Sequence, residues 1–228
     1  MRLRLSEERP TEPPTGYKIA HPVLSHDGTR AGFTGVSLGG ALPYGVLADA
    51  SCVYGLRHKA PHRRCDCGFH CVHDRTTAEA LLCTAEHRTA ALLEVSVLGR
   101  YIRFERGFRY ARQRVRTATV GPCACGTVAA ALADAGWGRP GWRALAPSCA
   151  DCVHGRMSLS LADFARLAGD RLRVVAGAGS TIAGFEPPEG LGVPELTAEA
   201  ALLQARLDWF QAQLARLGGH GPGGAPQG

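Results

Sequence analysis

The chain has 228 residues, of which 45% are hydrophobic and 20% are charged, and its formal net charge at pH 7 is +6. This composition suits one large globular domain or two small ones. No apolar run approaches the ~18 residues that a membrane-spanning helix needs. The first ten residues carry charges where a secretion signal needs an apolar segment. We therefore expect a cytoplasmic protein with no membrane partner.

The basic residues are almost all arginine. Lys18 and Lys59 are the only lysines among the 26 lysine and arginine residues, a bias typical of a high-GC bacterial genome such as that of an actinobacterium. Codon usage explains the choice of arginine over lysine. It does not explain the excess of positive charge, which favours an anionic partner.

Nine cysteines are the most informative feature of the composition. A reducing cytoplasm disfavours disulfides, and an odd number of cysteines cannot all pair. Clustered cysteines in such a chain are typically metal ligands or redox groups.

The first half of the chain begins with a charged, proline-bearing segment, residues 1–16, which we expect to be a flexible arm. Glycines then interrupt short apolar stretches over residues 17–51, which indicates irregular strands and turns. The next loop offers more cysteines and histidines than one zinc ion uses. We predict a zinc site formed by Cys52, His58, Cys65 and Cys67, with Cys71 as a substitute ligand and His62, His70 and His73 as lesser candidates.

The order of Cys52, His58, a proline and Cys65-Asp-Cys67-Gly68 resembles short cysteine-rich elements of uncharacterised actinobacterial zinc-binding proteins. The resemblance covers about residues 50–72. It implies metal binding and carries no further function.

A helix and a hairpin are predicted after this loop. Thr76 or Thr77 can cap a helix over residues 78–87, and Cys83 within it is interpreted as a small core residue. Residues 91–98 and 101–106 are predicted as hairpin strands, joined by a turn at Gly99-Arg100. The periodicity of residues 108–120 leaves strand and short helix open.

Arginines are densest between residues 100 and 116, where aromatic residues interleave with them. Arginines contact phosphates and aromatic rings stack on bases, so this segment is a candidate nucleic-acid surface. The alternative is the solvated face of an amphipathic hairpin, because charged and apolar residues alternate along it. Both interpretations stay open, and the candidate nucleic-acid-binding residues are Arg103, Arg106, Arg109, Arg112, Arg114 and Arg116.

The second cysteine cluster consists of Cys123-x-Cys125 and Cys149-x-x-Cys152. Two chelating pairs are the usual pattern of a four-thiolate zinc site, and tetrahedral coordination at ~2.3 Å needs no further ligand. The same four cysteines suit an iron–sulfur cluster, which is the alternative.

The remaining elements include two short helices and a strand. We predict helices over residues 127–135 and 163–168, the second starting at Ser158 or Ser160, and a strand over residues 172–175. A linker (179–196) leads to an amphipathic helix (197–217) and a disordered tail (218–228). The apolar residues of that helix are alternately three and four apart, which allows self-association, protein binding or docking onto its own domain.

Together these patterns predict an α+β fold: a small mixed sheet or hairpin with short helices, two zinc sites and a C-terminal amphipathic helix. The expected modules are residues 17–120 and 121–178. The function we expect is non-catalytic, that of an intracellular zinc-binding module that binds or regulates a partner, with nucleic acid favoured over protein. The alternatives are a metalloenzyme that uses the first site and an iron–sulfur or thiol redox sensor. Neither His-x-Glu nor His-Glu-x-x-His occurs in the chain, which disfavours zinc deaminases and metalloproteases.

Overall fold

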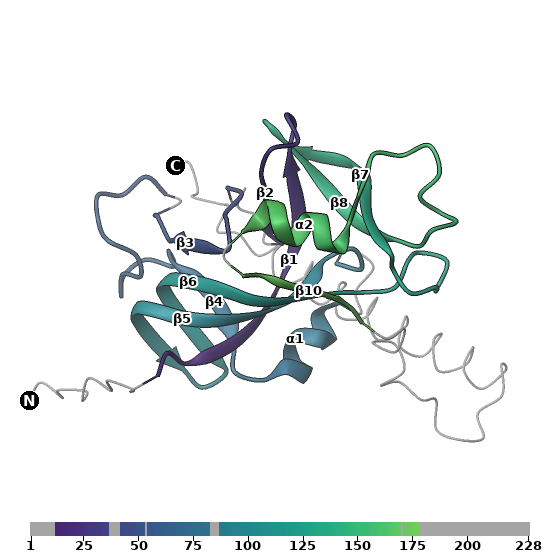
Figure 1. The fold of residues 1–228 in the computed structure, drawn as a ribbon. Coiled ribbons are helices and arrows are strands. Elements are labelled where there is room, and N and C mark those ends of the chain that lie inside the picture. Colours follow the sequence, from purple (N-terminus) through teal and green to yellow (C-terminus); the bar gives the residue numbers. More distant parts are fainter. Residues whose placement is uncertain (1–11, 37–41, 53, 83–86, 170, 178–228) are drawn as a thin grey trace, which may run out of the picture. The chain divides into compact units, whose positions relative to one another are not determined.

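All residues described in the computed structural model belong to one compact unit, residues 1–184. They form ten strands and two helices, and all ten strands belong to one sheet (Figure 1). The predicted α+β fold with a small sheet is therefore wrong, because the described part of the chain is mostly β. None of its helices is long and apolar enough to cross a membrane. The structure describes residues 12–36, 42–52, 54–82, 87–169 and 171–177.

The linker, the C-terminal helix and the tail predicted after residue 178 lie outside the described residues, as do Cys83 and most of the N-terminal arm. Strands from both predicted modules belong to the same sheet. In chain order the elements are β1 (Thr15–Ser25), β2 (Ala31–Gly35), β3 (Leu47–Asp49), β4 (Phe69–Val72), α1 (Arg75–Leu82), β5 (Ala91–Phe104), β6 (Gly107–Val120), β7 (Ala131–Arg139), β8 (Trp142–Ser148), β9 (Ser158–Ser160), α2 (Leu161–Ala168) and β10 (Arg173–Ala176).

A long hairpin of β5 and β6, each 14 residues long, forms the centre of the sheet. Its turn lies at Glu105 and Arg106, so the turn predicted at Gly99-Arg100 is wrong. The pairing register shifts there instead, and Gly99 has a φ of 67°, as in a bulge within a continuous strand. The segment 108–120, which the sequence left open, is strand β6.

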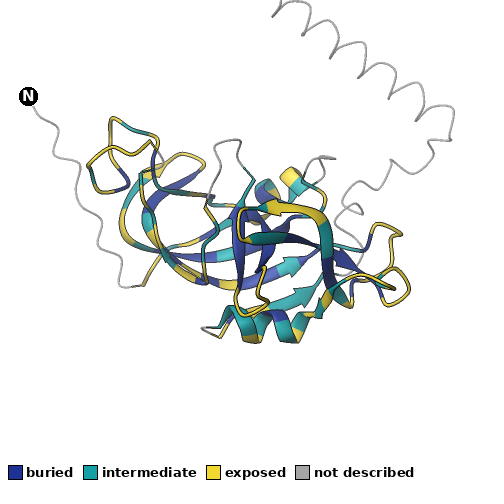
Figure 2. Ribbon diagram, turned by 90° about the horizontal axis from the view of Figure 1, so that it is seen from above, coloured by how far each residue is buried: buried dark blue, intermediate teal, exposed yellow. Residues whose placement is uncertain are grey.

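β6 is paired along both edges. β5 lies on one edge, and β4, β3 and β10 share the other edge in turn. β1 pairs with both β4 and β5, so β1, β5, β6 and β4 form a closed circuit of paired strands. Buried side chains of these strands fill the main core, among them Leu93, Val95, Tyr110 and Val115. Figure 2 shows buried residues along the central strands and exposed ones in the loops and turns.

The two helices begin at polar caps. The Asp74 carboxylate accepts hydrogen bonds from the backbone amide and the hydroxyl of Thr77, so Asp74 caps α1 in place of the predicted threonines. The Ser160 hydroxyl accepts a hydrogen bond from the backbone amide of Asp163 at 3.0 Å, which confirms the predicted start of α2.

The helix predicted over residues 127–135 is wrong, because residues 131–139 form strand β7. Alanine favours helix locally, but β7 is hydrogen-bonded to β8 on one edge and to β9 on the other. Leu132 and Ala133 are fully buried in this position. Long-range pairing and burial therefore outweigh the helical propensity of the segment.

Candidate metal centres

The structure brings the predicted ligands together in two groups, and within each group the ligand atoms all lie within 4.8 Å of one another. Tetrahedral coordination at ~2.3 Å places thiolate sulfurs ~3.8 Å apart, so each group has the size of a site for one ion. Both groups can therefore hold a metal ion. Site one consists of Cys52, His58, Cys65 and Cys67, and site two of Cys123, Cys125, Cys149 and Cys152.

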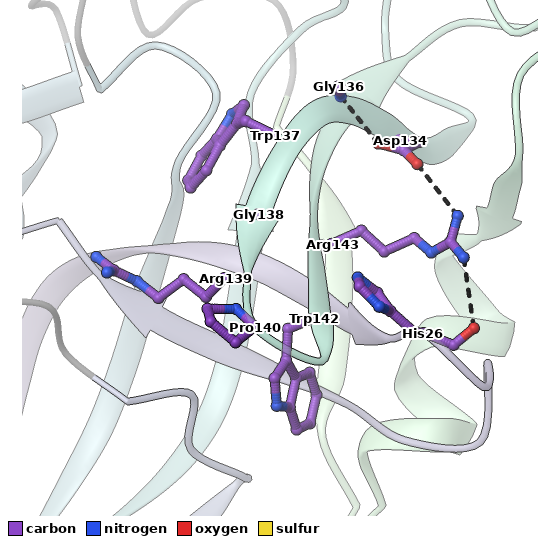
Figure 3. Close-up of a pocket in the computed structure, with 9 residues that line it drawn as sticks. All are labelled: His26, Asp134, Gly136, Trp137, Gly138, Arg139, Pro140, Trp142 and Arg143. Carbon is purple, nitrogen blue, oxygen red and sulfur yellow. Dashed lines mark hydrogen bonds and ion pairs between the residues drawn. The ribbon is translucent and has the colours of Figure 1, made fainter.

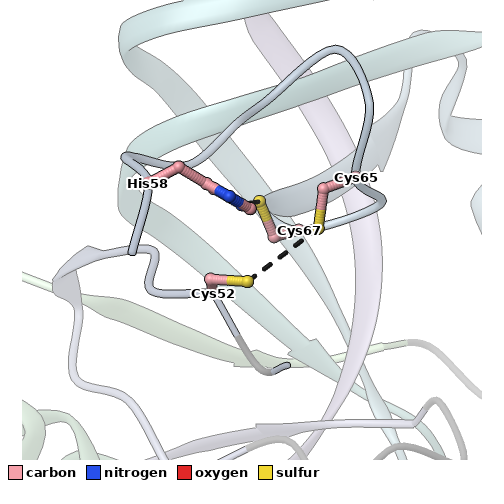
Figure 4. A group of neighbouring side chains, drawn as sticks. All are labelled: Cys52, His58, Cys65 and Cys67. Carbon is pink, nitrogen blue, oxygen red and sulfur yellow. Dashed lines mark hydrogen bonds between the residues drawn. The ribbon is translucent and has the colours of Figure 1, made fainter. Parts of the chain in front are cut away.

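Site one lies in the loop between β3 and β4, where its four side chains point toward one another (Figure 4). The Sγ atoms of Cys52 and Cys65 are 3.8 Å apart, and His58 Nε2 lies 3.1 Å from Cys67 Sγ. Cys67 is buried, and the other three ligands are partly buried. Four potential ligand atoms are thus gathered within one loop.

A glycine makes the turn of site one possible. Gly68 follows the last ligand with a φ of 125°, a conformation that other residues rarely adopt. A Cβ atom at this position would lie 3.1 Å from the Arg109 side chain and 3.2 Å from the Tyr110 carbonyl oxygen. The loop can therefore pack this closely on β6 only with glycine here.

Arg109 attaches site one to β6. Its guanidinium donates hydrogen bonds to the backbone oxygens of Cys65, at 2.6 Å, and His62, at 3.2 Å, and to the Asp66 carboxylate at 3.2 Å. The residue is only 6% exposed. These hydrogen bonds fix the segment that carries Cys65 and Cys67 and so orient their side chains. Arg109 was predicted only as part of a nucleic-acid surface, and its contacts with the loop of site one were not predicted.

The substitute ligands do not belong to either group. Cys71 lies in β4 within the core, where burial raises the pKa of its thiol to about 11. His73 Nε2 lies 2.9 Å from the Phe104 carbonyl oxygen. His62 stacks its ring on that of His58, with the ring centroids 4.5 Å apart, and so supports a ligand without being one.

Site two joins two loops, the one between β6 and β7 and the one between β8 and β9. Cys123 and Cys149 are buried, whereas Cys125 and Cys152 are exposed. The Sγ atoms of Cys125 and Cys149 are 3.6 Å apart. The backbone amide of Gly126 donates a hydrogen bond to the Cys123 carbonyl oxygen at 2.8 Å, which closes the turn that carries the first pair.

The thiols of site two ionise unequally. The side chain and backbone of Thr127 lower the pKa of Cys125 to about 6. The neighbouring cysteines, Cys149 first among them, raise the pKa of Cys152 to about 12. The first thiolate thus forms readily, and its charge opposes the next. A divalent cation removes this repulsion, so the arrangement favours metal binding.

Site one shows the same pattern. Desolvation disfavours the Cys52 thiolate, but hydrogen bonds from the backbone of Leu56 and Tyr54 outweigh it, and the pKa is lowered. Desolvation raises the pKa of Cys65. Each site therefore contains at least one thiol with a lowered pKa, which is Cys52 in site one and both Cys123 and Cys125 in site two.

The six candidate nucleic-acid-binding arginines have different surroundings. Arg109 belongs to site one. Arg112 forms a bidentate ion pair with Asp49 of β3, with N–O distances of 2.7 and 2.9 Å. Arg116 donates a hydrogen bond to the Ser96 hydroxyl. All of these arginines except Arg109 are exposed, including the remaining three, Arg103, Arg106 and Arg114.

Each group offers its four ligand atoms from side chains alone, so a tetrahedral ion needs no additional ligand.

Comparisons of the chain with family models, with curated proteins and with solved structures found no match.

Proposed function

We propose that the chain is a non-catalytic zinc-binding protein in which two structural zinc ions hold the loops of a β domain that binds a partner. One observation carries this proposal: each group contains four ligand atoms within 4.8 Å of one another. Three cysteines with one histidine, and four cysteines, are both common ligand sets of structural zinc sites.

Zinc fits the two groups better than an iron–sulfur cluster does. In a four-iron cluster each cysteine binds a different iron, so the sulfurs stand farther apart than around a single ion. The Sγ–Sγ distances of 3.8 Å in site one and 3.6 Å in site two match a single tetrahedral ion. Site one also includes the imidazole of His58, a typical zinc ligand.

A structural role is favoured over a catalytic one. Catalytic zinc keeps a coordination position for water or substrate. Both groups instead supply a full set of protein ligands, and site one is further fixed by the hydrogen bonds from Arg109. The ions would replace a hydrophobic core in two loops that have few buried apolar residues of their own.

Nucleic acid is the partner that we favour. The net charge of +6 attracts an anionic partner, and Arg106 and Arg114 are exposed on the central hairpin. The ion pair between Arg112 and Asp49 lowers the positive charge of this surface, because Asp49 neutralises the charge of Arg112. This part of the proposal is independent of the metal content.

Metal analysis of the purified chain and its variants tests the proposal. We expect two zinc ions per chain, one ion in Cys65→Ser and one in Cys123→Ser. Cys71→Ala is the matched control, because Cys71 is a buried cysteine outside both groups, and it should retain two ions. Iron with absorbance near ~400 nm would instead indicate an iron–sulfur protein, and a chain without metal would refute the proposal.

A further inference from the structure

A pocket of about 550 Å³ lies at the end of the β7–β8 hairpin, formed by residues that belong to neither metal centre. Its volume is within the range of small-ligand sites. Figure 3 shows the side chains that line it, which come from the hairpin and from the turn after β1. The residues that matter to its chemistry are His26, Asp134, Trp137, Arg139, Trp142 and Arg143.

Glycines give this hairpin its shape. The register between β7 and β8 shifts between Asp134 and Gly138, and Gly136 within the shift has a φ of 78°. A Cβ atom on Gly138 would collide with the carbonyl oxygen of Trp142. The close approach of the two strands therefore depends on glycine, and the irregularity leaves Trp137 43% exposed.

Two tryptophans are held at the pocket by contacts behind them. Trp137 packs against the buried His21, with the rings perpendicular and their centroids 4.9 Å apart. The guanidinium of Arg30 lies 5.3 Å from the centroid of Trp142. Tryptophan is mostly buried in folded proteins, so two ordered and partly exposed indoles in one pocket indicate a flat ligand that stacks on them.

The charges at the pocket are mainly positive. Asp134 accepts a hydrogen bond from the Gly136 amide and lies 3.5 Å from Arg143, which also bonds to the carbonyl oxygen of His26. This leaves Arg139 without an acidic partner among the residues that line the pocket. Arg30 is not one of them, and it lies close enough to Asp27 to help lower the pKa of that carboxyl group. The Nε atom of Arg139 is buried and has no hydrogen-bond partner among the described residues. An anionic group in the pocket would balance the charge of the Arg139 guanidinium.

We infer that the pocket binds a nucleotide unit, its base stacked on a tryptophan and its phosphate held by Arg139. Aromatic stacking combined with arginine contacts to phosphate is how proteins bind single-stranded nucleic acid. The inference rests on the proposed preference for nucleic acid. It places the main nucleic-acid contact at the β7–β8 hairpin and not on β6. The unit is either a free nucleotide or one residue of a single strand, and both present the same chemistry. A neutral sugar also stacks on tryptophan, but it does not use the positive charge.

Tryptophan fluorescence gives a direct measurement, because two of the three tryptophans line the pocket and Trp209 can be removed. In a Trp209→Phe background, the zinc-loaded chain is titrated with AMP, with a ten-residue oligothymidylate and with inorganic phosphate. We expect quenching by AMP, by the oligonucleotide or by both, and none by phosphate alone. The affinity should fall as salt is added and should drop at least tenfold in Trp137→Ala and in Arg139→Gln.

Arg166→Gln is the matched control, because it removes one exposed arginine of α2 that belongs neither to the pocket nor to the candidate nucleic-acid-binding residues. Binding equal to that of the parent chain supports the pocket, whereas loss in this variant but not in Arg139→Gln overturns it. Quenching by AMP assigns the site to free nucleotides, and binding of the oligonucleotide alone assigns it to single strands.

Zinc content and circular dichroism show whether Trp137→Ala is still folded. If it is not, Trp137→Leu and Arg139→Gln, which keep side-chain bulk, provide the comparison. No binding by a chain that carries two zinc ions refutes the pocket and leaves the metal proposal intact. Salt-independent binding of a neutral oligosaccharide in place of nucleotides also refutes it.

Discussion

Lys18 is a partly buried lysine whose ammonium lies 5.0 Å from the ring centroids of both Tyr44 and Phe69. Desolvation lowers the pKa of this group from 10.5 to about 8, and the nearby Cys71 opposes the shift only in part. The folded chain thus carries this charge at a cost that the unfolded chain does not have.

Replacing this residue tests that cost. We expect Lys18→Met to raise the free energy of unfolding at pH 7 by about 1–2 kcal/mol, because ~1.4 kcal/mol per pKa unit is partly offset by lost cation–π attraction. Between pH 8 and 10.5 the unfolded chain binds a proton that the folded chain has lost, so wild-type stability rises relative to the variant. Denaturant titrations at pH 7 and pH 10 should show the difference shrinking, and a constant difference would contradict the account.

Arg109 offers a second test at the scale of one residue. Arg109→Gln removes the donors to Cys65 and His62, so the zinc affinity of site one should fall about 10–100-fold, as for other residues that orient metal ligands. Arg112→Gln is the control, since this exposed arginine of the same strand pairs with Asp49 and touches no ligand. Competition with a chromophoric chelator measures both, and equal effects would show that Arg109 has no special role.

Residue spacing predicted which cysteines and which histidine come together, because each close pair sits on a local turn. That these side chains bind zinc stays a prediction. The eight predicted ligands fall in two groups, as the structure shows. Arg109 could not be predicted in its role, because its contact with Cys65 joins residues 44 apart in the chain. An arginine among many arginines gives no local signal of such a contact.

At the scale of elements, the sequence predicted those helices and strands that a capping residue or an apolar run is enough to specify. The start of α2 at Ser160 and the strand near residues 172–175 are examples. Local signals failed where pairing with distant strands determines the structure. β7 forms a strand because β8 and β9 pair with it. β5 continues through Gly99 because its pairing with β6 accommodates the bulge. A single sequence does not show either partner.

The loops and the central hairpin should respond differently to metal removal. Chelation of zinc should speed amide hydrogen exchange in the loops of site one and site two by at least tenfold, because the ions are proposed to be their main constraint. Amides of β5 and β6 should keep most of their protection, since they are paired along the hairpin and buried in the apolar core. Uniform loss of protection across the sheet would show instead that the ions hold the whole fold.

At the scale of the whole described unit, β6 connects the loops of the two candidate metal sites. It pairs with β3 and β4, which flank the loop of site one, and it leads into the loop that begins site two. A closed circuit of strands gives both loops a rigid base. If zinc binds as proposed, the two loops would extend the surface beyond the hydrophobic core, which fits the proposed role of binding a partner.

X-ray absorption at the zinc edge of the purified chain tests the central claim most directly, because it reports which atoms surround the ions. The proposal predicts seven sulfurs and one nitrogen shared by two zinc ions, with sulfur at ~2.3 Å. A first shell of that composition in the whole chain, and of sulfur alone in His58→Cys, would support two closed structural sites. If the two zinc ions together have more than one oxygen or nitrogen neighbour, at least one site has an open position. That result would contradict the proposal of two closed structural sites.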